Sequence, residues 1–388
     1  NKKKELPMND TQLLTKAKDE VKKSYEKYFA RIKKDEYRER LDKFYNAVAA
    51  VYDPHTTYLI PEDQEDFKIR MSGKLEGIGA VLREDGSFIK VEKIMVGSAS
   101  WKQKELQEDD IILKVAQASG EAISVVDMSI QDAVKLIRGP KGSIVKLTVK
   151  SPNGLIKVIA IKRDVVEIED TYVRSTLLQY KKDGEKIGYI NVPSFYRDFD
   201  NRSGRNCTDD TRLAIESLQK QGIKGLILDL RGNGGGALED ARLISGLFFS
   251  QGPVVQVKSS TGEVEVLADK DPRVQYEGNL IVMIDRFSAS ASEIVAGALQ
   301  DYGRAIIVGG DHSHGKGTVQ AVIELDNSSI FSSGDALDKN GEKISPLGAI
   351  KLTIQSFYRV NGISTQQIGV TPDIIFPDMY SYLESGEK

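Results

Sequence analysis

Cysteine, histidine and long apolar runs are scarce in this sequence, and each shortage excludes a class of protein. Among 388 residues there is one cysteine, Cys207, and there are three histidines. A single cysteine excludes an internal disulfide framework and a multi-cysteine metal site. No stretch reaches the roughly 18 consecutive apolar residues that a membrane-spanning helix needs, and the net charge of −3 offers no basic excess for nucleic acid. The basic start NKKKELPMND has no apolar stretch behind it, so we expect any signal peptide to have been removed or to lie outside this sequence.

The N-terminal region, residues 1–66, reads as a helical segment. Apolar residues recur at three- and four-residue steps between residues 10 and 50, as in RLDKFYNAVAAVY. Pro54 and Pro61 stop the pattern, because proline cannot continue a helix. We interpret this segment as a packing domain, with contact to a partner or substrate as the alternative.

Residues 67–165 change to short strands punctuated by glycine, with a turn signal at Asp85-Gly86. One helix is expected in SIQDAVKLIRG, capped by Ser129 and stopped by Gly139-Pro140. This order predicts a small, partly open β-barrel or sandwich. The glycine-containing segment LEGIGA, residues 75–80, can present backbone N–H groups to a carboxylate, and the strand that follows can pair with an incoming peptide.

Residues 166–388 alternate strand and helix patterns. Continuous apolar runs such as GLILDL and LIVMID are each followed by a helical pattern, which predicts βα units with covered strands and an α/β class. Functional groups collect at the ends of strands in such folds. Two strand ends here carry informative residues, RGNGGG at 231–236 and FSASASE at 287–293.

The glycine cluster at residues 231–236 allows three interpretations. Glycines lack Cβ atoms, so their backbone N–H groups can approach a ligand closely. The ligand is either a phosphate or the oxyanion of a tetrahedral intermediate, and the third reading is an ordinary tight turn. The spacing matches neither the P-loop nor the dinucleotide fingerprint.

Three serines alternate with alanine at the second strand end, Ser288, Ser290 and Ser292. They read either as helix-capping residues or as a strand-to-helix turn that exposes one nucleophilic hydroxyl at the positive end of a helix. The sequence is not the Gly-x-Ser-x-Gly elbow of the hydrolases.

A base for such a serine is not obvious. His55, His312 and His314 lie in loop-like sequence, where solvated histidines are common, and Asp311-His312-Ser313-His314 also reads as an incomplete set of metal ligands. Lys316 is either a surface charge or, if burial lowers its pKa, a general base. In an extended segment Gln320 would share a face with Lys316 and could hold its amine without adding charge.

Taken together, these motifs resemble the carboxy-terminal processing (tail-specific) serine proteases, with the best fit to the bacterial periplasmic subgroup. The resemblance runs from YDPHTTYLIPED to GVTPDI and rests on segments in the family's order: LEGIGAVL, AVKLIRGPKGSIVKL, LILDLRGNGGGAL, DRFSASASEI, QDYGRAIIVGG, GKGTVQ and FYRVNGISTQQIGVTPDI. It implies a catalytic core (166–388) of ClpP/crotonase-like α/β fold, an inserted β-rich PDZ domain (67–165) and the N-terminal helical segment (1–66).

The resemblance also implies roles for individual residues. Ser290 becomes the nucleophile of a Ser–Lys dyad, Lys316 its general base and Gln320 the residue that orients the base. The oxyanion hole would be the N–H groups of Ala291 and Gly236, with Gly235 as the alternative. Asp301 matches an acidic position of the family, for which a structural role is favoured over a catalytic one. The substrate's C-terminus would be bound by Leu75, Glu76, Gly77, Ile78, Gly79 and Ala80, with Arg138 sensing the bound peptide.

The predicted function is therefore a serine endopeptidase that recognises apolar, unstructured C-terminal tails and needs no metal or nucleotide cofactor. A periplasmic location, an adaptor or a homo-oligomer follow from the resemblance alone. The alternatives are a non-catalytic PDZ scaffold and a crotonase-like acyl-CoA enzyme. Two departures stand out: one extra residue in GGDHSHGK, and a PDZ segment without the usual Gly-Pro-Ala and Gly-Asp forms. The larger family members also carry a long C-terminal helical region, whereas this sequence stops soon after the core.

Overall fold

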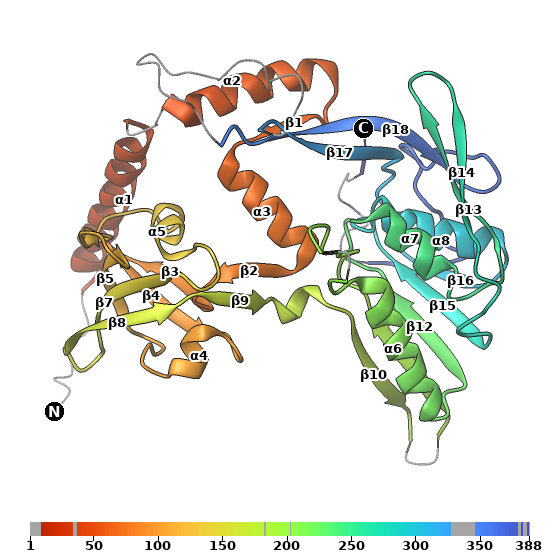
Figure 1. Ribbon diagram of the computed structural model, residues 1–388, viewed down its shortest axis with the longest axis horizontal. Coiled ribbons are helices and arrows are strands. Elements are labelled where there is room, and N and C mark those ends of the chain that lie inside the picture. Colours follow the sequence, from red (N-terminus) through yellow and green to blue (C-terminus); the bar gives the residue numbers. More distant parts are fainter. Residues whose placement is uncertain are drawn as a thin grey trace. The chain divides into compact units, whose positions relative to one another are not determined.

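The structure is a computed structural model. It describes residues 9–33, 37–181, 184–201, 203–326, 346–378, 382 and 386–387. The chain divides into two units, residues 1–64 with 320–353 and residues 65–319 with 354–388 (Figure 1). Residues 1–8 and 34–36 of the predicted helical segment lie outside the described residues, as do residues 327–345 of the predicted catalytic core.

The first unit contains the predicted N-terminal helices. They are α1 (Asp10–Lys33) and α2 (Tyr37–Tyr52), and α2 ends two residues before Pro54. Strand β1 (Thr57–Leu59) follows and pairs antiparallel with residues 349–351, the start of β18 (Ala349–Tyr358). Asn46 ties α2 to β1, because its side chain both donates to the carbonyl and accepts from the N–H of Tyr58. In the described part of the chain, no helix combines the length and apolar character needed to cross a membrane.

The second unit opens with a β-rich domain. Its elements are α3 (Pro61–Ser72, which begins in the first unit), β2 (Lys74–Gly77), β3 (Ala80–Asp85), β4 (Phe88–Ile94), α4 (Ala99–Gln103), β5 (Ile111–Gln117), β6 (Ile123–Ser124), α5 (Ile130–Ile137), β7 (Ile144–Lys150), β8 (Ile156–Lys162) and β9 (Asp164–Glu167). Strands β3-β4-β5-β7-β8 form an antiparallel sheet in that order, with β6 beside β5. The predicted turn at Gly86 joins β3 to β4. The predicted cap is also present, since the hydroxyl of Ser129 accepts from the N–H of Asp132 at 3.1 Å.

The rest of the second unit is built on a mostly parallel sheet. Its elements include β10 (Arg174–Gln179), β11 (Lys186–Asn191), α6 (Cys207–Lys220), β12 (Gly225–Asp229), α7 (Leu238–Ser245), β15 (Asn279–Ile284), α8 (Ala291–Asp301), β16 (Ile306–Gly309) and β19 (Ile374–Ile375). The order is β10-β11-β12-β15-β16-β19, and every neighbouring pair except β10-β11 is parallel. The predicted βα units and α/β class are therefore confirmed. The hairpin β13 (Gly252–Ser259) and β14 (Val264–Asp269) was not anticipated.

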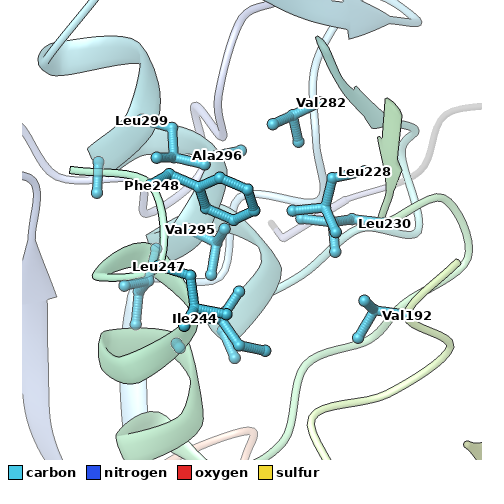
Figure 2. Close-up of a cluster of buried hydrophobic side chains, with 14 of the residues drawn as sticks. Val192, Leu228, Leu230, Ile244, Leu247, Phe248, Val282, Val295, Ala296 and Leu299 are labelled. Carbon is cyan, nitrogen blue, oxygen red and sulfur yellow. The ribbon is translucent and has the colours of Figure 1, made fainter. Parts of the chain in front are cut away.

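Helices α7 and α8 bury their apolar faces together with side chains of the sheet (Figure 2). Leu228 on β12 and Val282 on β15 are fully buried, as are Phe248 after α7 and Leu299 on α8. Burying each of these side chains contributes about 1.5–3 kcal/mol before the entropy cost. Leu230, just past the end of β12, belongs to the same cluster. The core therefore extends to the loop that follows β12 and fixes where that loop begins.

Candidate active site

Three loops meet at the carboxyl ends of three neighbouring parallel strands. Strand β12 pairs with β15, and β15 pairs with β16. Their following loops carry the glycine cluster 231–236, the serine triplet and Lys316, respectively. Because parallel strands end at one edge of the sheet, side chains that are far apart in sequence come together there. The structure therefore brings together most of the residues predicted for catalysis.

The three serines of the triplet have different surroundings. Ser288 and Ser292 are fully buried, and their hydroxyls donate to the carbonyls of Leu230 and Asn233, each at 2.8 Å. Both hydroxyls thus tie this turn to the glycine loop after β12. Ser290 is only partly buried, so it is the member of the triplet that a substrate can approach.

The backbone of Ser290 is strained. Its φ and ψ are +55° and −109°, outside the regions that a residue with a Cβ normally occupies. Such conformations cost about 1–3 kcal/mol and persist where the surroundings impose them. Ser290 stands immediately before Ala291, the first residue of α8. A sharp strand-to-helix turn of this kind presents a hydroxyl beside the positive end of a helix.

The glycine loop leaves selected N–H groups open. The N–H groups of four residues, Gly232, Asn233, Gly235 and Ala237, donate to Asp285 Oδ1, Leu230 O, Asn233 Oδ1 and Phe195 O. Among the described residues, no hydrogen bond uses the N–H of Gly236, of the exposed Gly234 or of Ala291. A Cβ on Gly235 would lie 3.0 Å from Ser290 Cβ and 3.3 Å from Ala291 N, so the two loops are in contact.

Glu293, in the first turn of α8, joins the serine turn to the lysine loop. Its carboxylate is fully buried, and Oε2 accepts the N–H groups of both Ser290 (2.7 Å) and Lys316 (3.0 Å). Oε1 accepts the hydroxyl of Ser313 (2.5 Å) and the N–H of Gly315 (2.7 Å). Burial raises the pKa of this carboxyl, and these four hydrogen bonds oppose the rise. The backbones of the candidate nucleophile and base are therefore held on one oxygen atom.

Sequence reasoning missed Glu293, although a signal was present. Ser290 and Glu293 have the Ser-x-x-Glu spacing of a capping box. That pattern predicts the bond from Glu293 to the N–H of Ser290. It does not predict that the same carboxylate reaches a loop twenty residues downstream, because that contact depends on the tertiary fold.

The histidines occupy other positions. His55 lies in the first unit, between α2 and β1. The ring of His312 is 2.6 Å from the carbonyl of Ser313, and the ring of His314 is 3.5 Å from the carboxylate of Glu387. The backbone of His314 donates to the carbonyl of Ser288 at 2.9 Å, which fixes the loop that leads to Lys316.

Gln320 and Asp301 have identifiable neighbours. Gln320 lies on β17 (Thr318–Glu324), which starts after Lys316, and in the first unit its amide donates to the hydroxyl of Thr353 at 3.3 Å. Asp301 ends α8 and accepts two hydrogen bonds from the guanidinium of Arg359, at 2.7 and 3.1 Å. The two bonds between Asp301 and Arg359 anchor the C-terminal end of α8.

A second buried acid lies at the end of β12. Asp229 accepts hydrogen bonds from the backbone and guanidinium of Arg231 and, at 2.5 Å, from the hydroxyl of Tyr189. Burial alone would raise the pKa of Asp229, but these hydrogen bonds and the charge of Arg231 outweigh it and lower the pKa. The cluster holds the first residue of the glycine loop against the sheet.

The predicted peptide site in the β-rich domain is only partly a loop. Residues 75–77 belong to β2 and pair with β9, Ile78 is buried in the domain core, and Ala80 starts β3. Strand β3 lies at the end of its sheet, so its outer edge has no strand partner in the described part of the chain. Arg138, at the end of α5, passes Gly77 and forms an ion pair with Asp66 of α3 at 2.6 Å.

The second unit therefore combines a β-rich domain with an α/β core whose strands end in a strained serine turn and a glycine loop. Comparisons with known proteins identify these parts. Residues 186–376 match peptidase family S41, residues 66–150 match the PDZ domain, and residues 1–62 match the tail-specific protease N-terminal domain.

Two relatives define the family. The chain is 41% identical over 345 residues to the tail-specific protease of Haemophilus influenzae, covering 89% of this chain and 46% of that protein. It is 32% identical over 364 residues to the carboxy-terminal processing protease CtpA of Bacillus subtilis, covering 92% of this chain and 68% of that protein. The protein belongs to the carboxy-terminal processing proteases of peptidase family S41, and it spans about half the length of the Haemophilus relative.

Two solved structures were also matched by the comparison. The photosystem II D1 C-terminal processing protease is 23% identical, with a TM-score of 0.47 over 88% of this chain and 83% of that one. The PDZ domain of a Vibrio cholerae carboxy-terminal protease, solved with a peptide, is 36% identical, with a TM-score of 0.24 over 24% of this chain and 98% of that domain.

Proposed function

We propose that the protein is a serine endopeptidase that cleaves polypeptides with apolar, unstructured C-terminal tails, using a Ser–Lys dyad. The observation that carries the proposal is the convergence at Ser290. Ser290 is partly exposed in a strained turn, and Glu293 accepts the N–H groups of both Ser290 and Lys316. Among the described residues, no hydrogen bond uses the N–H groups of Ala291 and Gly236. Membership of peptidase family S41 supports the same reading.

In the proposed first step, the hydroxyl oxygen of Ser290 attacks the scissile carbonyl carbon while the neutral amine of Lys316 accepts the hydroxyl proton. The carbonyl oxygen becomes an oxyanion, and the N–H groups of Ala291 and Gly236 donate to it. Gly236 is preferred over Gly235, because the N–H of Gly235 already donates to Asn233. The site at the N-terminus of α8 adds a favourable dipole.

The remaining steps return the enzyme to its starting state. Lys316 passes its proton to the leaving amine as the peptide bond breaks, which leaves an acyl group on Ser290. A water molecule then attacks the acyl carbon and gives a proton to Lys316. As the bond between the acyl carbon and Ser290 breaks, Lys316 returns this proton to the Ser290 oxygen, which releases the new C-terminus and restores the neutral amine. In this scheme Gln320 orients Lys316, and Asp301 has a structural role that its ion pair with Arg359 supports.

The β-rich domain, residues 67–165, is proposed to bind the substrate's C-terminal tail. The match to the PDZ domain and the unpaired outer edge of β3 support this role, because an extended peptide can add to such an edge. Residues 75–80 would meet the terminal carboxylate, and Arg138 would sense it. The proposal divides the rest of the chain into a helical segment (1–66) and a catalytic core (166–388). It also includes a periplasmic location and association with an adaptor or with further copies of the chain.

Mass mapping of cleavage products tests the proposal, with one substrate protein prepared with and without an apolar C-terminus. We expect cleavage that depends on the tail, and its loss in Ser290→Ala and in Lys316→Ala with an unchanged melting temperature. Substitution of the exposed Ser203 by alanine serves as the control and should leave cleavage intact. Full activity in Ser290→Ala would contradict the dyad. Tail binding without any cleavage would favour a peptide-binding scaffold, and stabilisation by CoA but not by peptide would favour an acyl-CoA enzyme.

A further inference from the structure

We propose that Asn233 is a positioning residue that sets the oxyanion hole, by turning the N–H of Gly235 away from the reacting centre and leaving that of Gly236 to face it. This inference rests on the proposed function. It concerns a side chain inside the glycine cluster 231–236 to which the sequence pattern assigns no role.

Asn233 is the only residue with a side chain inside the cluster 232–236, and it is fully buried. Its amide group donates to the carbonyl of Val192 at 2.8 Å, and its amide oxygen accepts the N–H of Gly235 at 2.9 Å. Its own N–H donates to the carbonyl of Leu230 at 3.1 Å. Val192 and Leu230, whose carbonyls accept these bonds, belong to the apolar core (Figure 2). The side chain and the backbone N–H of Asn233 therefore fix the glycine loop to the apolar core.

The carbonyl of Asn233 reaches the serine turn. It accepts the N–H of Ala289 at 3.0 Å and the hydroxyl of Ser292 at 2.8 Å, one residue before and two after Ser290. Asn233 thus attaches the glycine loop to the nucleophile turn on both sides of Ser290, in addition to the bonds from Ser288 to Leu230 and from Gly232 to Asp285. A displacement of Asn233 would change the distance between the two halves of the oxyanion hole.

The orientation of the Gly235–Gly236 peptide follows from these contacts. The carbonyl of Gly235 accepts the N–H of Phe195 at 3.0 Å. In a trans peptide the C=O and N–H groups point in opposite directions, so the N–H of Gly236 points away from Phe195. The bond from Gly235 to Asn233 Oδ1 fixes the preceding peptide, and the positive φ values of Gly235 (+105°) and Gly236 (+145°) make this path accessible only to glycine.

The position requires asparagine, because it needs one donor and one acceptor on a short side chain. Aspartate keeps the acceptor for Gly235 but places a second acceptor against the carbonyl of Val192. Leucine has a similar size but neither group. In both cases a buried polar group loses its partner, which costs more than the bond contributes, and the loop relaxes to another path.

The first test compares Asn233→Asp with Asn206→Asp, which changes another largely buried asparagine at the N-cap of α6. The readouts are kcat and KM for an apolar-tailed peptide, and the affinity for a peptide aldehyde that forms a tetrahedral adduct with Ser290. Losing an oxyanion donor reduces kcat by about 10²–10³-fold. We expect a loss of that order in kcat and in aldehyde affinity for Asn233→Asp, with KM within about threefold of the parent, and little change for Asn206→Asp.

If Asn233 only stabilised the fold, Asn233→Asp would lower the melting temperature and would change the aldehyde affinity and KM to a similar extent. Unchanged kcat and aldehyde affinity in a folded Asn233→Asp protein would overturn the inference. If Asn233→Asp does not fold, the test uses NMR of the unaltered enzyme labelled with ¹⁵N-glycine. Formation of the aldehyde adduct should shift the N–H resonance of Gly236 and leave the N–H of Gly235 protected from solvent exchange. A shift of the Gly235 N–H instead would also overturn it. If the unaltered enzyme neither cleaves peptide nor forms the adduct, the proposed function fails, and this inference falls with it.

Discussion

Replacing Glu293 by glutamine removes the group that holds the nucleophile turn and the lysine loop together. The carboxylate accepts four hydrogen bonds in a site without solvent exposure. A glutamine side chain has nearly the same shape but only one acceptor oxygen. Whichever way its amide turns, two of the four donors face an NH2 group. The substitution therefore changes the hydrogen bonding with little change in packing.

The magnitude follows from the bonds lost and the charge removed. Buried hydrogen bonds to a charged group contribute about 1.5–3 kcal/mol each, so two lost bonds cost about 3–6 kcal/mol. Burial raises the pKa of Glu293, which means that the buried charge is itself unfavourable, and a neutral amide recovers part of the cost. We expect a net destabilisation of about 2–4 kcal/mol, which in a unit of this size lowers the melting temperature by about 5–15 °C.

Thermal unfolding followed by circular dichroism measures the effect, together with hydrogen exchange of the N–H groups of Gly315 and Lys316. Glu239→Gln is the matched control, because that carboxylate is about half exposed (51%) and its ion pair is with Arg242 on the same helix. The control should shift stability by less than about 0.5 kcal/mol. Equal melting temperatures for the two variants, with unchanged exchange in the lysine loop, would refute the role assigned to Glu293.

Two further predictions concern the glycine loop and its neighbour. Gly236→Ala should abolish cleavage and destabilise the fold, because the new Cβ would lie 2.3 Å from the carbonyl oxygen of Phe195, whereas Gly234→Ala, which meets nothing within 4 Å, should behave like the parent in both assays. Asp229 should make stability fall in acid. Its pKa is lowered in the folded protein, so its contribution is present above the unfolded value near 3.8 and is lost as the pH falls through the lower folded value. The difference in melting temperature between the parent and Asp229→Asn should therefore shrink below about pH 4, and a constant difference from pH 7 to pH 3 would contradict this.

The sequence predicted the elements whose boundaries depend on local features such as apolar runs, glycine and proline. Continuous apolar runs such as GLILDL marked β12, and glycine and proline marked the ends of helices α2 and α5. Strand β10 and the β13–β14 hairpin were not predicted. Strands β10 and β14 carry many exposed side chains and few buried ones, so they lack the continuous apolar run of a covered strand. Their positions depend on neighbours far away in the sequence.

In the candidate site, too, the sequence predicts what local motifs determine and misses what contacts between distant segments determine. The motif order indicated which serine and lysine to consider, but the difference among the three serines lies in the buried contacts of Ser288 and Ser292 and in the φ of Ser290. No sequence pattern specifies a positive φ at a serine. The roles of Glu293 and Asn233 come from contacts between loops that only the sheet brings together.

The attachment points of the lysine loop explain how its length can vary. Two hydrogen bonds fix Ser313 to Val370: its N–H donates to the carbonyl of Val370, and its hydroxyl accepts from the N–H of the same residue. Before Ser313 the loop has a longer contact, in which Asp311 lies 3.7 Å from Arg286. The predicted extra residue falls in the run 309–316, and the stretch between Gly310 and His312 precedes the two hydrogen bonds of Ser313. We therefore expect that a residue can be added or removed before Ser313, by evolution or by an engineer who inserts a reporter. The hydrogen bonds from Ser313 onward would still fix the position of Lys316.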